Sequence, residues 1–149
     1  MITFRPATAL DLPIFVSLDK ELFPYSPWSA QQYKDEFAHE TRHFVVALNQ
    51  AQAIIGYAGV FVPGAGVAAD ILTLGVIAQH RRQGIARTLM GLLTEWASAR
   101  DASAMILEVK IENTEAIDLY QSLGYEKLNV RRDYFGSGQD ALVMRKQLQ

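Results

Sequence analysis

The stretch Arg81-Arg82-Gln83-Gly84-Ile85-Ala86 follows an apolar run typical of a strand, residues 71–76, and leads into one typical of a helix, residues 85–96. A strand that turns through a glycine into a helix leaves several backbone N–H groups free. It also points the positive end of the helix dipole at the space in front of them. The two arginines add positive charge at the same place. The stretch therefore predicts an anion site whose natural ligand is a diphosphate.

Other phosphate-binding motifs are absent from the chain. A nucleotide P-loop requires GxxxxGK[ST], and a dinucleotide fold requires GxGxxG followed by an acidic residue on the next strand. The sequence contains neither pattern. Taken alone, RxxGxA also fits an ordinary strand-to-helix turn, so the rest of the chain must decide between the two interpretations.

Composition limits the class of protein. With 149 residues, a mass of 16.6 kDa and 50% hydrophobic residues, we expect one domain over residues 1–149. The net charge of −2 predicts binding to neither nucleic acid nor membranes. Without cysteine, a disulfide, a thiolate metal site and a cysteine nucleophile are excluded. No signal-peptide pattern and no long apolar run occurs, so we expect a cytoplasmic protein.

Hydrophobic periodicity predicts a mixed α/β order, β-α-α-β-β-β-α-β-α-β-β. In the first helix, Thr8 or Asp11 is the expected cap. Ser29 and Gln32 form a capping box for a second helix over residues 30–39, with Trp28 and Tyr33 in the positions of a hydrophobic staple. The expected strands cover residues 2–5, 44–48, 54–62, 69–76, 103–109, 125–132 and 140–146, and the last two should form a hairpin.

A second group of candidate residues lies in the C-terminal half. Glu108 ends an apolar strand, where a carboxylate is either a structural residue with a local hydrogen bond or a base in a poorly solvated site. Asn113 and Tyr120 are two helical turns apart, so both face one groove. From the residues alone, Tyr120 is more simply a half-buried core tyrosine.

Together these features resemble the GCN5-related N-acetyltransferase (GNAT) superfamily. Its coenzyme A pyrophosphate loop reads [QR]-x-x-G-x-[GA], which Arg81, Gly84 and Ala86 match. The resemblance covers essentially the whole chain. It implies a mostly antiparallel sheet that splays at the cofactor site, with helices on both faces. It also implies acetyl-CoA as cosubstrate, with residues 81–86 on its pyrophosphate and Leu74 and Val76 along its pantetheine arm.

Within that superfamily the chain looks like the bacterial ribosomal-protein-alanine N-acetyltransferases of the RimI type. The shared motifs are ExxxxN followed by LYxxLGY, the PWS segment at residues 27–29, and an RRxYY segment, here residues 131–135. The resemblance makes Glu108 the general base and Tyr120 the general acid, with Tyr120 and Asn113 contacting the cofactor. It places Trp28 and Tyr134 on the acceptor side.

The implied reaction is direct acetyl transfer to the α-amine of a protein N-terminus. A strand N–H near Val76 would donate to the developing oxyanion. The chain departs from the family in having Ile77-Ala78 after Val76 and Phe135 in place of the second tyrosine of the YY pair. Because Phe135 lacks a hydroxyl near the expected peptide site, a lysine side chain or a small-molecule amine remains an alternative acceptor. The oligomeric state is left open.

Two further function classes compete. His39-Glu40-Thr41-Arg42-His43 matches the HExxH signature of zinc hydrolases, which requires one continuous helix and a third ligand downstream. A strand pattern follows His43 at once, and Asp70 and His80 are the only candidate ligands. The pair is therefore more simply a solvated helix end.

A noncatalytic module that binds an acyl-coenzyme A is the other class. Glu108 and Tyr120 argue against it, because a binding module needs neither group.

Overall fold

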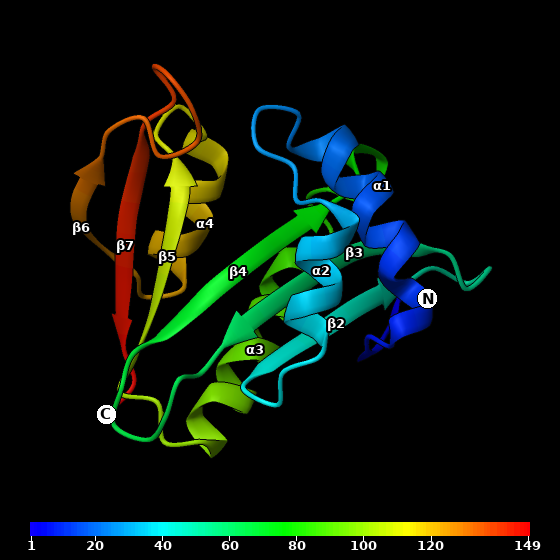
Figure 1. Cartoon of the computed structure of the whole chain (residues 1–149), viewed down its shortest axis with the longest axis horizontal. Coiled ribbons are helices and arrows are strands. Elements are labelled where there is room, and N and C mark those ends of the chain that lie inside the picture. The colour runs from blue at the N-terminus through cyan, green and yellow to red at the C-terminus, as the bar shows by residue number, and fades with distance from the viewer.

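The computed structural model describes residues 1–149 as a seven-stranded sheet with helices on both faces (Figure 1). The strands are β1 (Thr3–Pro6), β2 (Arg42–Leu48), β3 (Ile54–Phe61), β4 (Ala69–Val76), β5 (Ala104–Lys110), β6 (Glu126–Arg131) and β7 (Ala141–Gln147). The helices are α1 (Leu12–Leu22), α2 (Ala30–Phe37), α3 (Ile85–Ala99) and α4 (Thr114–Ser122), with short 3₁₀ turns η1 (Ala9–Asp11) and η2 (Ala78–His80). The element order is the one predicted.

The strands lie in the order β1-β2-β3-β4-β5-β7-β6. Every neighbouring pair is antiparallel except β4 and β5, which are parallel. These two strands pair only at their beginning, where Ala69 lies opposite Met105 and Asp70 opposite Ile106. Beyond that point they diverge, as Figure 1 shows, so the sheet opens into a wedge. The predicted hairpin of the last two strands is present as β6 and β7.

A β-bulge in β4 accompanies this opening. Gly59 lies opposite Thr73, and the next residue of β3, Val60, lies opposite Ile71, so Leu72 is an extra residue. A bulge bends its strand and increases the local twist. After Leu72 the strand therefore leaves the direction of β5, and its outer edge stays without a strand partner.

Two hydrophobic clusters hold the helices on opposite faces of the sheet. The larger lies between the sheet and helices α3 and α4, and includes Leu89, Leu93, Leu107 and Ile117. The smaller lies under α1 and α2 and is centred on Phe15, which packs edge-on against four aromatic rings. Each cluster excludes water from one face, so the wedge between β4 and β5 opens between two rigid layers.

The start of α2 agrees with the local sequence, whereas Asp11, the N-cap of α1, makes no side-chain capping bond to that helix. Ser29 Oγ accepts from the Gln32 N–H at 3.1 Å, and the Gln32 side chain accepts from the Ser29 N–H at 2.8 Å, which is the predicted capping box. The predicted staple is also present, with the rings of Trp28 and Tyr33 4.9 Å apart. The expected helix over residues 30–39 is two residues too long, since α2 ends at Phe37. A turn then leads into β2, which begins at Arg42.

Candidate functional site

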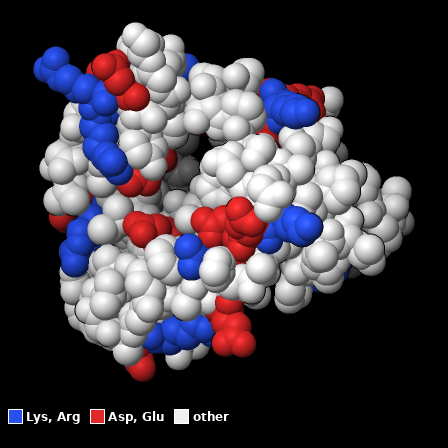
Figure 2. Space-filling view, viewed as in Figure 1, with Lys and Arg blue, Asp and Glu red and all other residues white.

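The wedge holds a cavity of about 1270 Å³, and Figure 2 shows the molecule hollowed there with acidic side chains at the rim. The volume exceeds the ~300–1,000 Å³ of common small-molecule sites, so it has room for more than one ligand. Of the site residues predicted from the sequence, only Gln83 does not line it. The others are Trp28, Leu74, Val76, Arg81, Arg82, Gly84, Ile85, Ala86, Glu108, Asn113, Tyr120 and Tyr134.

The loop before α3 presents free backbone donors to the cavity. The N–H groups from Arg82 to Arg87 donate to no backbone carbonyl of the chain. Gly84 and Arg82 have the positive φ angles +77° and +63°, which turn the chain so that successive N–H groups lie on its concave side. A glycine takes this conformation without steric cost. The loop therefore has the free N–H groups that the sequence predicted, and we call residues 82–87 the cradle because their arrangement fits a diphosphate.

The two arginines of the loop have different roles. Arg81 Nε donates to the Val76 carbonyl at 3.1 Å, so its side chain ties the loop to the end of β4. Arg82 is exposed, and its guanidinium lies 3.8 Å from the Glu115 carboxylate of α4. An exposed ion pair of this length contributes little to stability. The Arg82 guanidinium is thus free to turn toward an anion at the cradle.

The outer edge of β4 offers a second row of backbone groups. Ile77 donates to the Ile55 carbonyl at 3.0 Å, just beyond the pairs Gly56–Val76 and Tyr57–Gly75. In an antiparallel ladder, hydrogen-bonded and non-hydrogen-bonded pairs alternate. Val76 and Leu74 therefore turn their N–H and C=O groups away from β3 and toward the open wedge. An extended ligand can bind along this edge as an additional strand does.

Glu108 lies on the α1–α2 face of β5. Its carboxylate is 17% exposed and lies 3.5 Å from the Arg131 guanidinium of β6. Burial raises the pKa of Glu108, and the nearby Asp70 carboxylate raises it further, while Arg131 opposes both. A carboxylate with a raised pKa is a better proton acceptor than an ordinary one. Glu108 therefore lies in a poorly solvated site and also has a partner in Arg131.

Tyr120 enters the cavity from α4, where it is 7% exposed. Burial, with a smaller contribution from Tyr25, raises the pKa of its phenol, so the hydroxyl keeps its proton at neutral pH. Asn113 caps α4 by accepting from the Ala116 N–H at 3.2 Å. This bond uses only the amide oxygen of Asn113 and leaves its NH₂ group available to a ligand.

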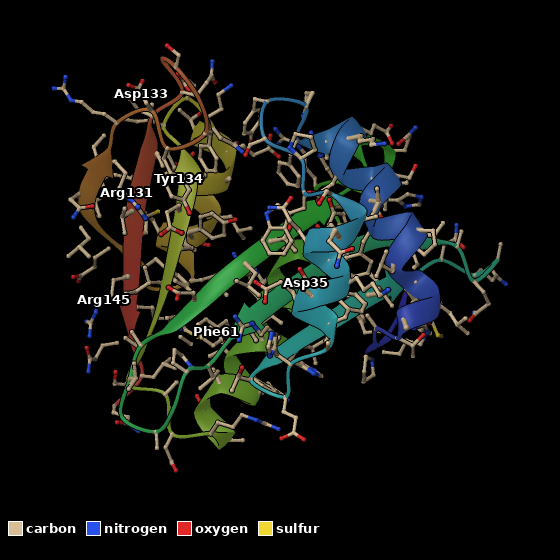
Figure 3. The ribbon with its side chains drawn as sticks, viewed as in Figure 1. Asp35, Phe61, Arg131, Asp133, Tyr134 and Arg145 are labelled. Atoms are coloured by element: carbon tan, nitrogen blue, oxygen red, sulfur yellow. The ribbon has the colours of Figure 1, made fainter.

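The α1–α2 loop and the β6–β7 loop meet over the cavity. The rings of Tyr25 and Phe135 are 5.4 Å apart, and Lys110 lies 4.5 Å from the Tyr25 ring. On the other side Arg131 stacks on Tyr134 at 4.3 Å; Figure 3 shows these two side chains together over β5 and β7. Phe135 thus contacts Tyr25 through a ring without a hydroxyl, at the place where the two loops meet.

Many lining residues had no role in the acetyltransferase site predicted from sequence, and three of them are titratable residues of α1, the α1–α2 loop and β4. Asp19 of α1 is 2% exposed and accepts from Tyr33 Oη, Tyr57 Oη and the Trp28 N–H at 2.7, 2.7 and 2.8 Å. Tyr25 and Asp70 are the other two. Asp70 did carry a signal, as the only charged residue of β4, whereas nothing in the helical pattern of α1 marks Asp19 as buried.

The HExxH segment does not form a metal site of the hydrolase kind. His39 follows the end of α2 and His43 lies in β2, so the two histidines do not share a helix. The expectation of a solvated helix end is wrong for His43, whose ring stacks on Trp96 at 5.0 Å. Burial, with help from Arg100, lowers the pKa of His43.

None of the helices combines the length and the apolar character needed to cross a bilayer.

Several known proteins have sequences similar to that of this chain. The chain is 30% identical to the N-alpha-acetyltransferase RimI of Mycobacterium tuberculosis over 97% of its own length and 92% of that protein. An uncharacterised Mycobacterium leprae protein, ML0378, is 32% identical over 99% of the chain, which spans 41% of that longer protein.

Two solved structures have the same fold as this chain. The ribosomal-protein-S18-alanine N-acetyltransferase of Escherichia coli superimposes with a TM-score of 0.86 at 25% identity, covering 100% of this chain and 95% of that one. Arabidopsis thaliana NAA60, solved in complex with acetyl-CoA, has the same fold with a TM-score of 0.89 at 20% identity, covering 99% of each chain.

The model of the acetyltransferase (GNAT) family matches residues 12–125, from the start of α1 to the residue before β6. This range contains the bulged strand, the anion cradle, Glu108 and Tyr120. The chain therefore belongs to the GNAT family of acetyltransferases, enzymes for which acetyl-CoA is the cosubstrate.

Proposed function

We propose that this chain transfers the acetyl group of acetyl-CoA to the α-amine of a protein N-terminus, in a single step within a ternary complex. The observation that carries the proposal is the placement of Glu108 on the α1–α2 face of the wedge, while the loop with the free N–H groups lines the same cavity through Arg82 and residues 84–87. A donor on the cradle and an acceptor beside Glu108 then meet between β4 and β5. The absence of cysteine from the chain agrees with transfer that uses no cysteine intermediate.

The chemistry assigns one task to each side chain. An α-amine has a pKa near 8, so only about a tenth of it is neutral at pH 7. Glu108 removes the proton, directly or through a water. The Val76 N–H donates to the oxygen of the attacked carbonyl as negative charge develops there. Tyr120 donates its proton to the thiolate as the C–S bond breaks. The nitrogen loses its second proton at the same stage, and this proton restores the Tyr120 phenol, so the step leaves an amide, a thiol and one proton on Glu108. The residues of the cradle hold the diphosphate in place.

The proposal extends to an N-terminal alanine of a ribosomal protein as the natural acceptor. Its support is the similarity to the M. tuberculosis and E. coli enzymes that carry those names. The aromatic contact between Tyr25 and Phe135 borders the acceptor side, so the Phe135 substitution is expected to affect the preference for the first residues of the peptide.

A peptide panel tests the class of acceptor. One peptide has a free α-amine and no lysine, a second has a blocked α-amine and one lysine, and a small amine completes the set. We expect coenzyme A release and a mass gain of one acetyl group with the first peptide only. Transfer to the second peptide or to the small amine alone would contradict the proposal, and binding of acetyl-CoA without any turnover would favour a noncatalytic module.

Two substitutions test the catalytic assignments. Glu108→Gln and Tyr120→Phe should each lower kcat about 10²- to 10⁴-fold. The KM for acetyl-CoA should stay within a few-fold, because neither side chain belongs to the cradle. Glu126→Gln, at an exposed position of β6, is the matched control for the charge change. Near-normal rates in both variants would show that these roles are wrong.

A further inference from the structure

The side chain of Asp70 shares a face of the sheet with Glu108. Ile71 and Leu107 belong to the hydrophobic cluster on the α3–α4 side. Because successive side chains of a strand point to opposite faces, the adjacent Asp70 and Glu108 both face the α1–α2 side. Asp70 lies opposite Ile106, two residues before Glu108, and both carboxylates line the cavity. The two groups therefore lie close together where β4 and β5 begin to separate.

Asp70 has no partner that explains its position. Burial raises the pKa of its carboxyl, and no donor or cation of the chain offsets this effect. A half-buried carboxylate without a partner lowers the stability of the fold. Such a cost is typical of residues that interact with a ligand.

The charged and titratable groups around the pair come from β4, β5, β6, β7 and the loop after β6. Arg131 binds Glu108 at 3.5 Å and stacks on Tyr134. Both carboxylates raise the pKa of the Tyr134 phenol, after the larger effect of burial. Two further cations share this face: Lys110 of β5 lies over the Tyr25 ring at 4.5 Å, and Arg145 of β7, opposite Ile106, donates to the Gln147 side chain at 2.6 Å. Arg131 is half exposed and already shared, so no cation of the chain offsets the charge of Asp70.

We propose that Asp70 is a second carboxylate of the acceptor site, which binds the ammonium form of the incoming amine and holds it beside Glu108. This inference rests on the proposed function, since it requires a cationic amine as acceptor. The ammonium compensates the charge that Arg131 leaves unbalanced. It then gives one proton to Glu108, and the neutral amine stays hydrogen-bonded to Asp70 while its lone pair attacks the acetyl carbonyl. Asp70 thus binds and orients, and Glu108 remains the base.

Steady-state kinetics of Asp70→Asn test the proposal. The KM for the peptide should rise about tenfold at pH 7.5, the effect of losing one charge-assisted hydrogen bond. The kcat at saturating peptide and the KM for acetyl-CoA should stay within about threefold. Asp118→Asn, an exposed neutralisation on α4 outside the cavity, is the matched control and should leave all three constants unchanged.

The pH profile adds a readout that a purely structural role would not change. Without the Asp70 charge, Glu108 loses its proton more easily, so the acidic limb of kcat/KM should move to lower pH in Asp70→Asn. Removing the opposing charge with Arg131→Gln should move the limb to higher pH. Asp70→Glu, which keeps the charge, should restore the wild-type limb at least in part.

Each outcome is decisive. An unchanged peptide KM, an equal rise in the KM for acetyl-CoA, or an unmoved acidic limb in a folded Asp70→Asn protein would overturn the role of Asp70. A wild-type rate in Glu108→Gln would instead overturn the role of Glu108 as the base, and a wild-type enzyme that does not acetylate the peptide with a free α-amine would overturn the proposed function. Thermal unfolding and circular dichroism confirm that each variant is folded. If Asp70→Asn does not fold, Asp70→Ser replaces it as the neutral variant. An unchanged peptide KM and an unmoved acidic limb in Asp70→Ser would then overturn the proposal.

Discussion

Glu108 shows how one residue can serve the reaction at the expense of the fold. Its carboxylate is mostly buried, lies close to a second carboxylate and receives only a long contact from Arg131. In the unfolded chain the same group is fully hydrated. Its ionised form is therefore less favourable in the folded protein than in the unfolded one, and this difference is the source of its basicity.

Glu108→Gln should therefore raise the thermal stability at pH 7. Because the folded pKa is raised, protonated Glu108 stabilises the fold below the ordinary glutamate pKa of about 4.3, and this contribution is lost as the pH rises through the raised value. The glutamine of Glu108→Gln is neutral at every pH, so this variant does not lose stability as the pH rises. We expect a higher Tm than wild type at pH 7 and no difference below pH ~4.

Calorimetry at the two pH values checks this prediction. The exposed Glu126→Gln should have no comparable effect at either pH. A Tm that falls at pH 7, or a gain of equal size at both pH values, would contradict the electrostatic account of Glu108.

At the scale of elements, the connection between β4 and α3 carries the donor site. Its shape depends on Gly84, which has a φ of +77°. Residues with a Cβ adopt this conformation at a cost of about 1–2 kcal/mol. The loop is also a purely local structure, so the sequence predicted the turn through Gly84 into a helix, although RxxGxA alone did not distinguish an anion site from an ordinary turn. The bulge at Leu72, in contrast, depends on the register with β3 and left no comparable pattern in the sequence.

Gly84→Ala should destabilise the protein by roughly 1 kcal/mol and weaken acetyl-CoA binding about tenfold. The loss arises because a relaxed backbone at residue 84 turns the neighbouring N–H groups away from the diphosphate. Gly64→Ala is the matched control, since a Cβ there meets no atom within 4 Å and the φ angle is not positive. Titration calorimetry with acetyl-CoA measures the change. Equal affinities of the two variants would contradict the cradle.

At the scale of the molecule, two layers must keep their positions on either side of an open wedge. Asp19 contributes to this on the acceptor side, because one carboxylate joins α1 to Tyr33 of α2, to Tyr57 of β3 and to the backbone at Trp28. Burial and the Asp19 charge both raise the pKa of the two tyrosines, so their hydroxyls remain donors. The loop between α1 and α2, which contains Trp28, is thus attached to the sheet through the buried side chain of Asp19.

Asp19→Ala should cost about 3 kcal/mol of unfolding free energy, because it leaves two buried hydroxyls and one N–H without an acceptor. It should also raise the peptide KM, since the Trp28 loop is no longer held. Tyr57→Phe, which removes one of the three bonds, should cost only ~1 kcal/mol. Urea unfolding measures both values. A smaller loss for Asp19→Ala than for Tyr57→Phe would show that Asp19 does not hold the layers together.

Local patterns in the sequence determined the order of helices and strands, the capping box at Ser29 and the turn around Gly84, whereas the roles predicted for Glu108 and Tyr120 came from the family resemblance. Each local pattern depends on residues a few positions apart, and hydrogen bonding and side-chain periodicity act over that range. Strand and helix ends were less exact, as for α2, because the last turn of a helix also depends on its tertiary contacts.

Only the tertiary structure decided which of these groups meet. The hydrogen bonds that Asp19 accepts join it to residues up to 38 positions away in the chain. The pairing of Asp70 with Ile106 likewise depends on the register of two strands that are distant in the chain. A shift of one residue would turn either carboxylate to the opposite face. Register is set by the packing of the whole sheet, so no short stretch of sequence contains that information.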